Sequence, residues 1–183
     1  MMNRKKGDRF IFYLKNKSVP FFVVFFFCLS SCGYHIAGRG GHIPSGIKTI
    51  AIPVFENKTM EPIVEEELTP AVIKGFIKDR RIEVTDKSQA DFMLHGSVTF
   101  YKEFPLSFDQ NQNVLEYRIT VTTHLRLLQQ STNHILWERD LTTNAEYRVS
   151  SDVMSTRTSK FLAIKEIAQN LSEEVTDRVL RGW

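Results

Sequence analysis

The chain has 183 residues, with 24 Lys and Arg against 21 Asp and Glu, which gives a net charge of +3. The first 31 residues hold six of the basic residues and one of the acidic ones, so the remainder carries a net charge of −2. Without a basic surplus in that remainder, composition gives no argument for nucleic-acid binding. The length of the remainder fits one compact domain.

The N-terminus has the pattern of a bacterial secretion signal. Basic residues precede an apolar run at residues 19–29 that contains five phenylalanines. This run is about half of the ~20 apolar residues that a helix needs to cross a bilayer, which favours a removable signal over a permanent span. The run ends in Leu29-Ser30-Ser31-Cys32, which resembles the lipobox of bacterial lipoproteins.

The lipobox predicts that residues 1–31 are a signal peptide and that Cys32 becomes a lipidated first residue. Cys32 then carries a covalent diacylglycerol on its thiol and an acyl chain on its new amine, because one chain alone binds a membrane only marginally. With Cys28 removed and Cys32 acylated, no free thiol remains for a disulfide or a metal site. The residue after Cys32 is Gly33. An Asp at this position favours retention of a lipoprotein in the inner membrane, so Gly33 predicts the outer membrane.

Glycines in residues 32–46 predict a lipidated arm, and residues 47–183 predict a single domain. Apolar, β-branched residues at 47–55 predict a first strand, followed by a turn at residues 56–59. Apolar residues spaced by three and four predict a helix over residues 62–78. Pro70 leaves two alternatives open: it kinks this helix, or it begins a shorter helix with Thr69 as N-cap.

Three later segments alternate apolar and polar residues and predict half-buried strands at residues 90–104, 116–127 and 134–147. The expected apolar faces include Phe100 in the first segment and Ile135 in the third, where Arg139 interrupts the face and suggests a β-bulge. The connections at residues 105–113 and 129–133 are short enough for antiparallel hairpins. An apolar stripe from Phe161 to Val179 predicts a long helix over residues 155–180.

This order of elements predicts an α+β fold. The expected architecture is a two-layer sandwich of about four mainly antiparallel strands, with two helices on one face, one of them long and C-terminal. Because each long strand has one polar side, the other face of the sheet should stay free of helices. That free polar face is the main structural expectation.

The sequence lacks the signatures of an active site or a metal site. No histidines are spaced as metal ligands within one helix, and no Ser lies in a nucleophile elbow, so we predict neither enzymatic activity nor a cofactor. The candidate contacts on the free face are Arg118, His124 and Arg126, because Arg forms paired hydrogen bonds with phosphate. The alternative is an ordinary solvated face on which Glu116 and Glu138 pair with the two arginines across strands.

Several sequence pieces together resemble the LptE family of lipopolysaccharide-assembly lipoproteins. They are Cys-Gly-Tyr-His from Cys32, Pro44, the strand Ile-Lys-Thr-Ile-Ala-Ile-Pro-Val-Phe-Glu-Asn-Lys-Thr from Ile47, and Leu-Glu-Tyr from Leu115. The resemblance implies two helices on a four-stranded sheet. It also implies two partners: an outer-membrane β-barrel, LptD, which the lipoprotein plugs from inside, and lipopolysaccharide. In the loop at residues 105–113, where family members can present a basic residue, the charged residue of this chain is Asp109.

We therefore expect a lipoprotein anchored on the periplasmic side of the outer membrane that assembles with the barrel and assists lipopolysaccharide transport. The alternative is a lipid-anchored scaffold or activator of a cell-envelope enzyme such as a peptidoglycan synthase. About a dozen residues separate Cys32 from the first strand, too few to cross the periplasm, which favours work at the outer membrane.

Overall fold

The computed structural model describes residues 48–181. These residues belong to one compact unit. The predicted signal peptide, the lipidation at Cys32 and the whole arm at residues 32–46 lie outside the described residues. Within residues 48–181, no helix is both long and apolar enough to cross a membrane.

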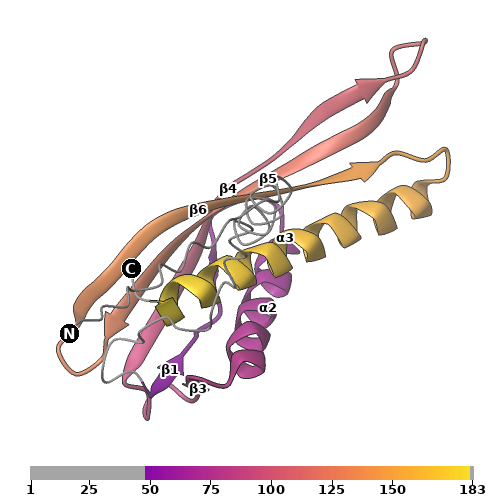
Figure 1. Cartoon of the computed structure of the whole chain (residues 1–183). Coiled ribbons are helices and arrows are strands. Elements are labelled where there is room, and N and C mark those ends of the chain that lie inside the picture. The colour runs from indigo at the N-terminus through magenta and orange to yellow at the C-terminus, as the bar shows by residue number, and fades with distance from the viewer. Residues whose placement is uncertain (1–47, 182–183) are drawn as a thin grey trace, which may run out of the picture. The chain divides into compact units, whose positions relative to one another are not determined.

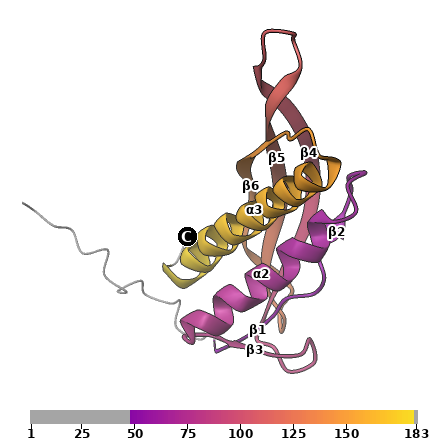
Figure 2. The same cartoon turned by 90° about the vertical axis from the view of Figure 1, so that its right-hand side faces the viewer.

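Six strands form one mixed sheet, and two helices lie on one side of it (Figures 1 and 2). The elements are β1 (Thr49–Ala51), β2 (Glu56–Asn57), α2 (Val64–Asp79), β3 (Glu83–Val84), β4 (Phe92–Phe108), β5 (Val114–Gln129), β6 (His134–Arg148) and α3 (Val153–Arg181). The sheet order is β3-β1-β4-β5-β6, with β2 also on β4. The three long strands are antiparallel, as expected, whereas β1, β2 and β3 pair in parallel. The α+β class is therefore confirmed, but the expectation of about four strands is too low.

The short strands account for that difference. The first predicted strand shrinks to β1, three residues long, and its apolar continuation runs through Pro53, which has no N–H to donate to a ladder. Glu56 and Asn57 form β2 where a turn was expected, because they pair in parallel with Ser97 and Val98. The third short strand, β3, was not predicted at all.

Helix α2 runs without interruption past Pro70, which lies inside it. The alternative in which Thr69 caps a shorter helix is therefore wrong. Thr69 is buried, and its hydroxyl accepts the Phe55 N–H and donates to the Glu65 carbonyl, both at 3.0 Å. This one side chain thus joins the segment before β2 to the helical turn that precedes the proline.

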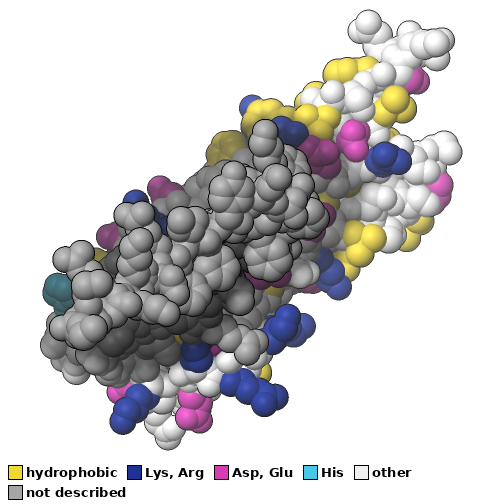
Figure 3. Space-filling model, viewed as in Figure 1, with side chains coloured by type: hydrophobic (Ala, Val, Ile, Leu, Met, Phe, Trp, Pro, Cys, Tyr) yellow, Lys and Arg dark blue, Asp and Glu magenta, His cyan; other side chains and the backbone are white. Residues whose placement is uncertain are grey.

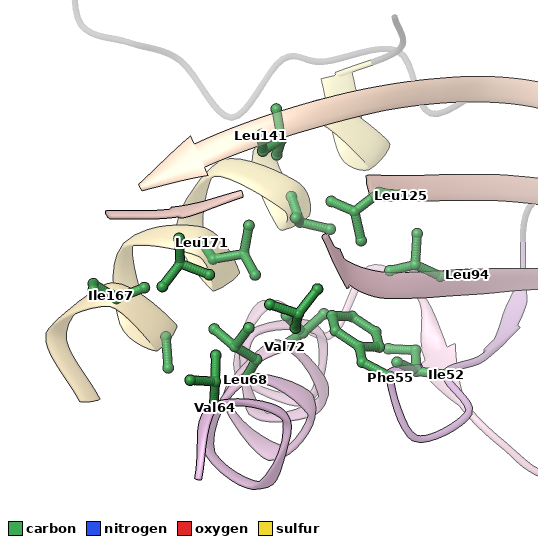
Figure 4. Close-up of a cluster of buried hydrophobic side chains, with 14 of the residues drawn as sticks. Ile52, Phe55, Val64, Leu68, Val72, Leu94, Leu125, Leu141, Ile167 and Leu171 are labelled. Carbon is green, nitrogen blue, oxygen red and sulfur yellow. The ribbon is translucent and has the colours of Figure 1, made fainter. Parts of the chain in front are cut away.

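The core lies between the helices and the sheet face that they cover (Figure 4). Helix α3 contacts β5 and β6, and α2 packs against α3. The side chains that meet there are aliphatic and almost fully buried: Leu68, Val72, Leu94, Leu125, Leu141, Ile167 and Leu171. Burying each one stabilises the fold by roughly 1.5–3 kcal/mol before entropy is counted. In α3 the burial starts at Ala163, so Phe161, expected on the buried stripe, is more exposed than predicted.

A β-bulge at Thr99 reverses the two faces of β4. Val98 pairs with Thr123, and Phe100 pairs with the next residue of β5, Thr122. Thr99 therefore has no pairing partner in β5 and forms the bulge. Phe100, expected on the buried face, is therefore turned away from the helices and is 41% exposed. Tyr101 and Glu103 take its place on the helix side. The strand then continues to Phe108, so the hairpin is longer than predicted.

The β4–β5 ladder shifts register twice more, between Pro105 and Ser107 and between Ser107 and Phe108. A further irregularity lies in β6, but not at the predicted place. Leu128 pairs with Ile135 and Leu127 with Trp137, so the register shifts at Leu136. Arg139 pairs regularly with Leu125, and the bulge predicted at Arg139 is wrong. The shift explains why Ile135, expected to be buried, is 41% exposed.

Candidate functional site

The sheet face opposite the helices, called here the free face, carries charged pairs across β5 and β6. Arg118 Nη2 lies 2.6 Å from Glu146 Oε1, and these residues are direct partners in the ladder. Farther along, Arg148 Nε lies 3.8 Å from Glu116 Oε1. Direct cross-strand pairs of opposite charge stabilise a sheet by roughly 0.2–1 kcal/mol each. The register between β5 and β6 therefore places most charged side chains of these two strands opposite side chains of the other sign.

His124 lies between two carboxylates of β6. Its Nδ1 is 2.7 Å from Asp140 Oδ1, and its Nε2 is 2.9 Å from Glu138 Oε1. Glu138 is also the partner of Arg126, at 3.9 Å. The structure thus brings two of the three predicted contacts, His124 and Arg126, together around one glutamate.

Arg118 lies apart from them, separated along β5 by threonines. The expected pairing of Glu138 with an arginine is present, but Glu116 does not pair with Arg118 because both residues are on β5. Arg118 uses Glu146 instead. A phosphate that bound Arg118 would have to compete with this carboxylate.

A hollow of about 310 Å³ lies on the free face beside Arg126. Its lining includes Lys58, His95, His124 and Arg126, together with Glu56. Burial, helped by the positive charges of Arg126 and Lys87, lowers the pKa of His95 below its usual value. His95 therefore stays neutral at pH 7, and the hollow can accept polar groups without a large net charge. Lys58 could not be assigned to it from sequence because β2 brings it there through a parallel pairing.

A polar cluster on the opposite side of the sheet was also missed. Glu103 accepts hydrogen bonds from Tyr101, at 2.9 Å, and from Tyr147, and Lys160 Nζ lies 2.9 Å from its carboxylate. Lys160 also contacts Glu61, at 3.0 Å. Burial raises the pKa values of Tyr101 and Tyr147, and their hydrogen bonds to Glu103 raise them further. These four side chains and Glu61 tie β4, β6 and α3 to the segment before α2, which is a structural role.

The distal part of the β4–β5 hairpin exposes apolar side chains, visible along its length in Figure 3. They are Phe104, Leu106, Phe108 and Leu115. Val153 and Met154 are also exposed, in the first turn of α3. At the hairpin tip, Asp109 Oδ1 accepts the N–H groups of Asn111 and Asn113, at 2.8 and 2.9 Å. Exposed apolar side chains gathered on one hairpin are typical of a contact with a partner.

These groups are suited to binding polar partners. Among residues 48–181, no group of three or more His, Cys, Asp or Glu side chains is placed to hold a metal ion. On the free face, Glu146 pairs with Arg118, Asp140 with His124, and Glu138 with both His124 and Arg126. The arrangement can bind polar groups and can present complementary charge to another surface.

Comparisons with known proteins agree with the fold. A protein from Chlamydia trachomatis has a TM-score of 0.51 at 13% identity, over 73% of this chain and 96% of that one. A protein from Xanthomonas campestris gives 0.55 at 14%, over 75% and 86%. The minor lipoprotein from Acinetobacter baumannii gives 0.50 at 14%, over 75% and 93%. No curated protein matches the sequence. A family model, LptE, described as lipopolysaccharide-assembly, matches residues 47–179.

Proposed function

Because the chain belongs to the LptE family of lipopolysaccharide-assembly proteins, we propose that it is an outer-membrane lipoprotein that assembles with and plugs the LptD β-barrel. In that position it assists the transport and insertion of lipopolysaccharide at the cell surface. This role is assembly and passage rather than catalysis, in keeping with the absence of an active-site signature from the sequence.

The observation that carries this proposal is the part of the free face formed by β5 and β6. Its charged side chains are paired across the two strands, Arg118 with Glu146 and Arg126 with Glu138. The lumen of an outer-membrane barrel is lined by polar side chains. A rigid sheet with internally balanced charges can face such a wall without leaving a desolvated charge unpaired.

The anchor in this proposal is Cys32, with the lipobox before it. Strand β1 begins at Thr49, so the segment from Cys32 to this strand is short and would hold the domain near the membrane that carries the lipid. Gly33 supports the outer membrane as that location. Lipopolysaccharide contact is proposed at His124 and Arg126, where the hollow of the free face admits polar groups, and at Arg118 if Glu146 is displaced.

The test is to purify the acylated protein from outer membranes and to identify the proteins that remain bound. The proposal expects a stable complex with one large β-barrel protein. A double variant, Arg118→Glu with Arg126→Glu, places like charges against Glu146 and Glu138 and should reduce the recovered barrel severalfold. Arg178→Glu is the matched control because Arg178 pairs with Glu174 on the exposed side of α3.

Recovery of the protein without any barrel would contradict the proposal. Recovery with a peptidoglycan synthase would instead support the lipid-anchored activator. If the double variant and the Arg178 control retain the barrel equally, the free face is not the contact surface, even though the complex exists.

A further inference from the structure

The outer edge of β4, on the side away from β5, changes at Thr99. Before that residue the edge is occupied by parallel neighbours, β1 at Phe92 and Met93 and β2 at Ser97 and Val98. The Lys58 N–H donates to the Val98 carbonyl at 2.9 Å, and the chain then leaves the sheet. Beyond the bulge, β4 pairs with β5 alone among the strands of residues 48–181. An unpaired edge of this kind is a template for an added strand.

The side chains along this open edge have a distinct pattern. Phe100, Lys102 and Phe104 lie on the free face, because their partners in β5 are free-face residues. All three are exposed, and Lys102 Nζ lies 4.8 Å from the centre of the Phe104 ring. Pro105 follows and cannot donate to a ladder, so the usable edge is residues 99–104. Its outward pattern is apolar, basic, apolar.

A groove of about 420 Å³ marks the start of the open edge. It is lined by residues 58–61 on one side and by residues 99–101 of β4 on the other. Met60 is fully exposed there, beside Phe100. An added strand could pair with β4 from the point where its pairing with β2 ends. The first apolar side chain of that strand would then contact Met60 and Phe100.

We propose that the edge at residues 99–104 receives an extended segment of a partner protein, added as a strand, whose free-face side chains run apolar, acidic, apolar. An acidic side chain opposite Lys102 gives an attractive cross-strand pair, and the flanking apolar side chains cover Phe100 and Phe104. A second copy of this chain fits less well. Antiparallel pairing that joins Phe100 to Phe104 would put Lys102 opposite Lys102.

The test uses the full chain purified in detergent and two fluorescein-labelled peptides, Thr-Val-Thr-Glu-Thr-Val-Thr and the same peptide with Lys in place of Glu. Fluorescence anisotropy should show that the Glu peptide binds about fivefold more tightly, as expected for one cross-strand charge pair. The variant Lys102→Glu should reverse the preference. Lys165→Glu is the matched control, because Lys165 also lies over an exposed phenylalanine, Phe161 at 4.5 Å, but on α3.

Hydrogen exchange locates the peptide. The amides of residues 99–104 should exchange more slowly in the complex, while those of β6, the other long edge of the sheet, stay unchanged. Equal binding of both peptides, no binding at millimolar concentration, or protection of β6 instead would overturn the proposal. Protection of residues 99–104 by detergent alone would also overturn it, in favour of a lipid surface. None of these measurements requires the barrel, so the proposed function can fail separately.

Discussion

Replacement of Glu103 by Leu should be among the most damaging changes to the stability of this domain. The Glu103 side chain is 25% exposed and accepts from Tyr101, Tyr147 and Lys160. Removal of the carboxylate leaves three donors without that acceptor, although Lys160 keeps Glu61. Hydrogen bonds to a charged group contribute about 1.5–3 kcal/mol each, and part of that is regained from water at a partly exposed site. We expect the free energy of unfolding to fall by about 3 kcal/mol.

The assay is urea unfolding followed by circular dichroism. Glu146→Leu is the matched control, because Glu146 also pairs across strands with a basic residue but on the solvated free face. Its loss should be below about 1 kcal/mol, as for exposed ion pairs. The reasoning is refuted if Glu103→Leu costs no more than Glu146→Leu.

The same cluster predicts a dependence on pH. Burial alone would raise the pKa of Glu103, but the hydrogen bonds from Tyr147, Lys160 and Tyr101 together outweigh it, and the pKa is lowered. A carboxyl group with a lowered pKa in the folded state stabilises the fold above its unfolded pKa, about 4.3. The difference in stability between the natural chain and Glu103→Gln should therefore be constant near neutral pH and shrink as the pH falls below about 4.3. A difference that grows in acid would contradict the assigned charge.

Three further predictions concern single side chains. Gly96→Ala should destabilise the fold by about 1–3 kcal/mol, because a Cβ at Gly96 would lie 2.7 Å from ring carbons of the buried Phe55. Thermal unfolding measures this loss, and an unchanged midpoint would mean that the Phe55 ring moves freely. Thr69→Val should lower the free energy of unfolding, measured in urea, by about 1–2 kcal/mol, because the Phe55 N–H loses its acceptor. An unchanged free energy would show that water replaces the hydroxyl. Asp109→Ala should speed amide exchange at Asn111 and Asn113 without changing global stability, and a global loss would show that the hairpin tip supports the core.

The long elements could be predicted because their evidence is local. In β5, residues at every second position from Ile119 to Leu127 are buried, and the alternation of the sequence reports this directly. Helix α3 likewise shows its buried stripe in residues spaced by three and four. The short parallel strands could not be predicted in the same way. β1 pairs with Glu83 and Val84, more than thirty residues along the chain, and two or three residues carry no period.

The bulge at Thr99 was hidden by the sequence around it. Residues 98–104 read Val-Thr-Phe-Tyr-Lys-Glu-Phe, in which both alternate sets contain aromatic and charged residues, so either face could be the buried one. The free-face residues Arg118, His124 and Arg126 were placed on the correct side because β5 has no such ambiguity. Their cross-strand partners could not be predicted, because these depend on the register between β5 and β6, which the sequence of one strand does not reveal.

The reversal of β4 at one residue has a consequence for how this chain tolerates insertions and deletions during evolution. Between Phe100 and Pro105, a gain or loss of one residue would exchange the two faces and turn Glu103 toward solvent while an aromatic ring met Lys160. Beyond Pro105 the ladder already shifts register twice before the tip, so the hairpin can change length there and at its tip, around residues 109–113. Related sequences should therefore differ in the length of this tip far more often than in the spacing from Thr99 to Glu103.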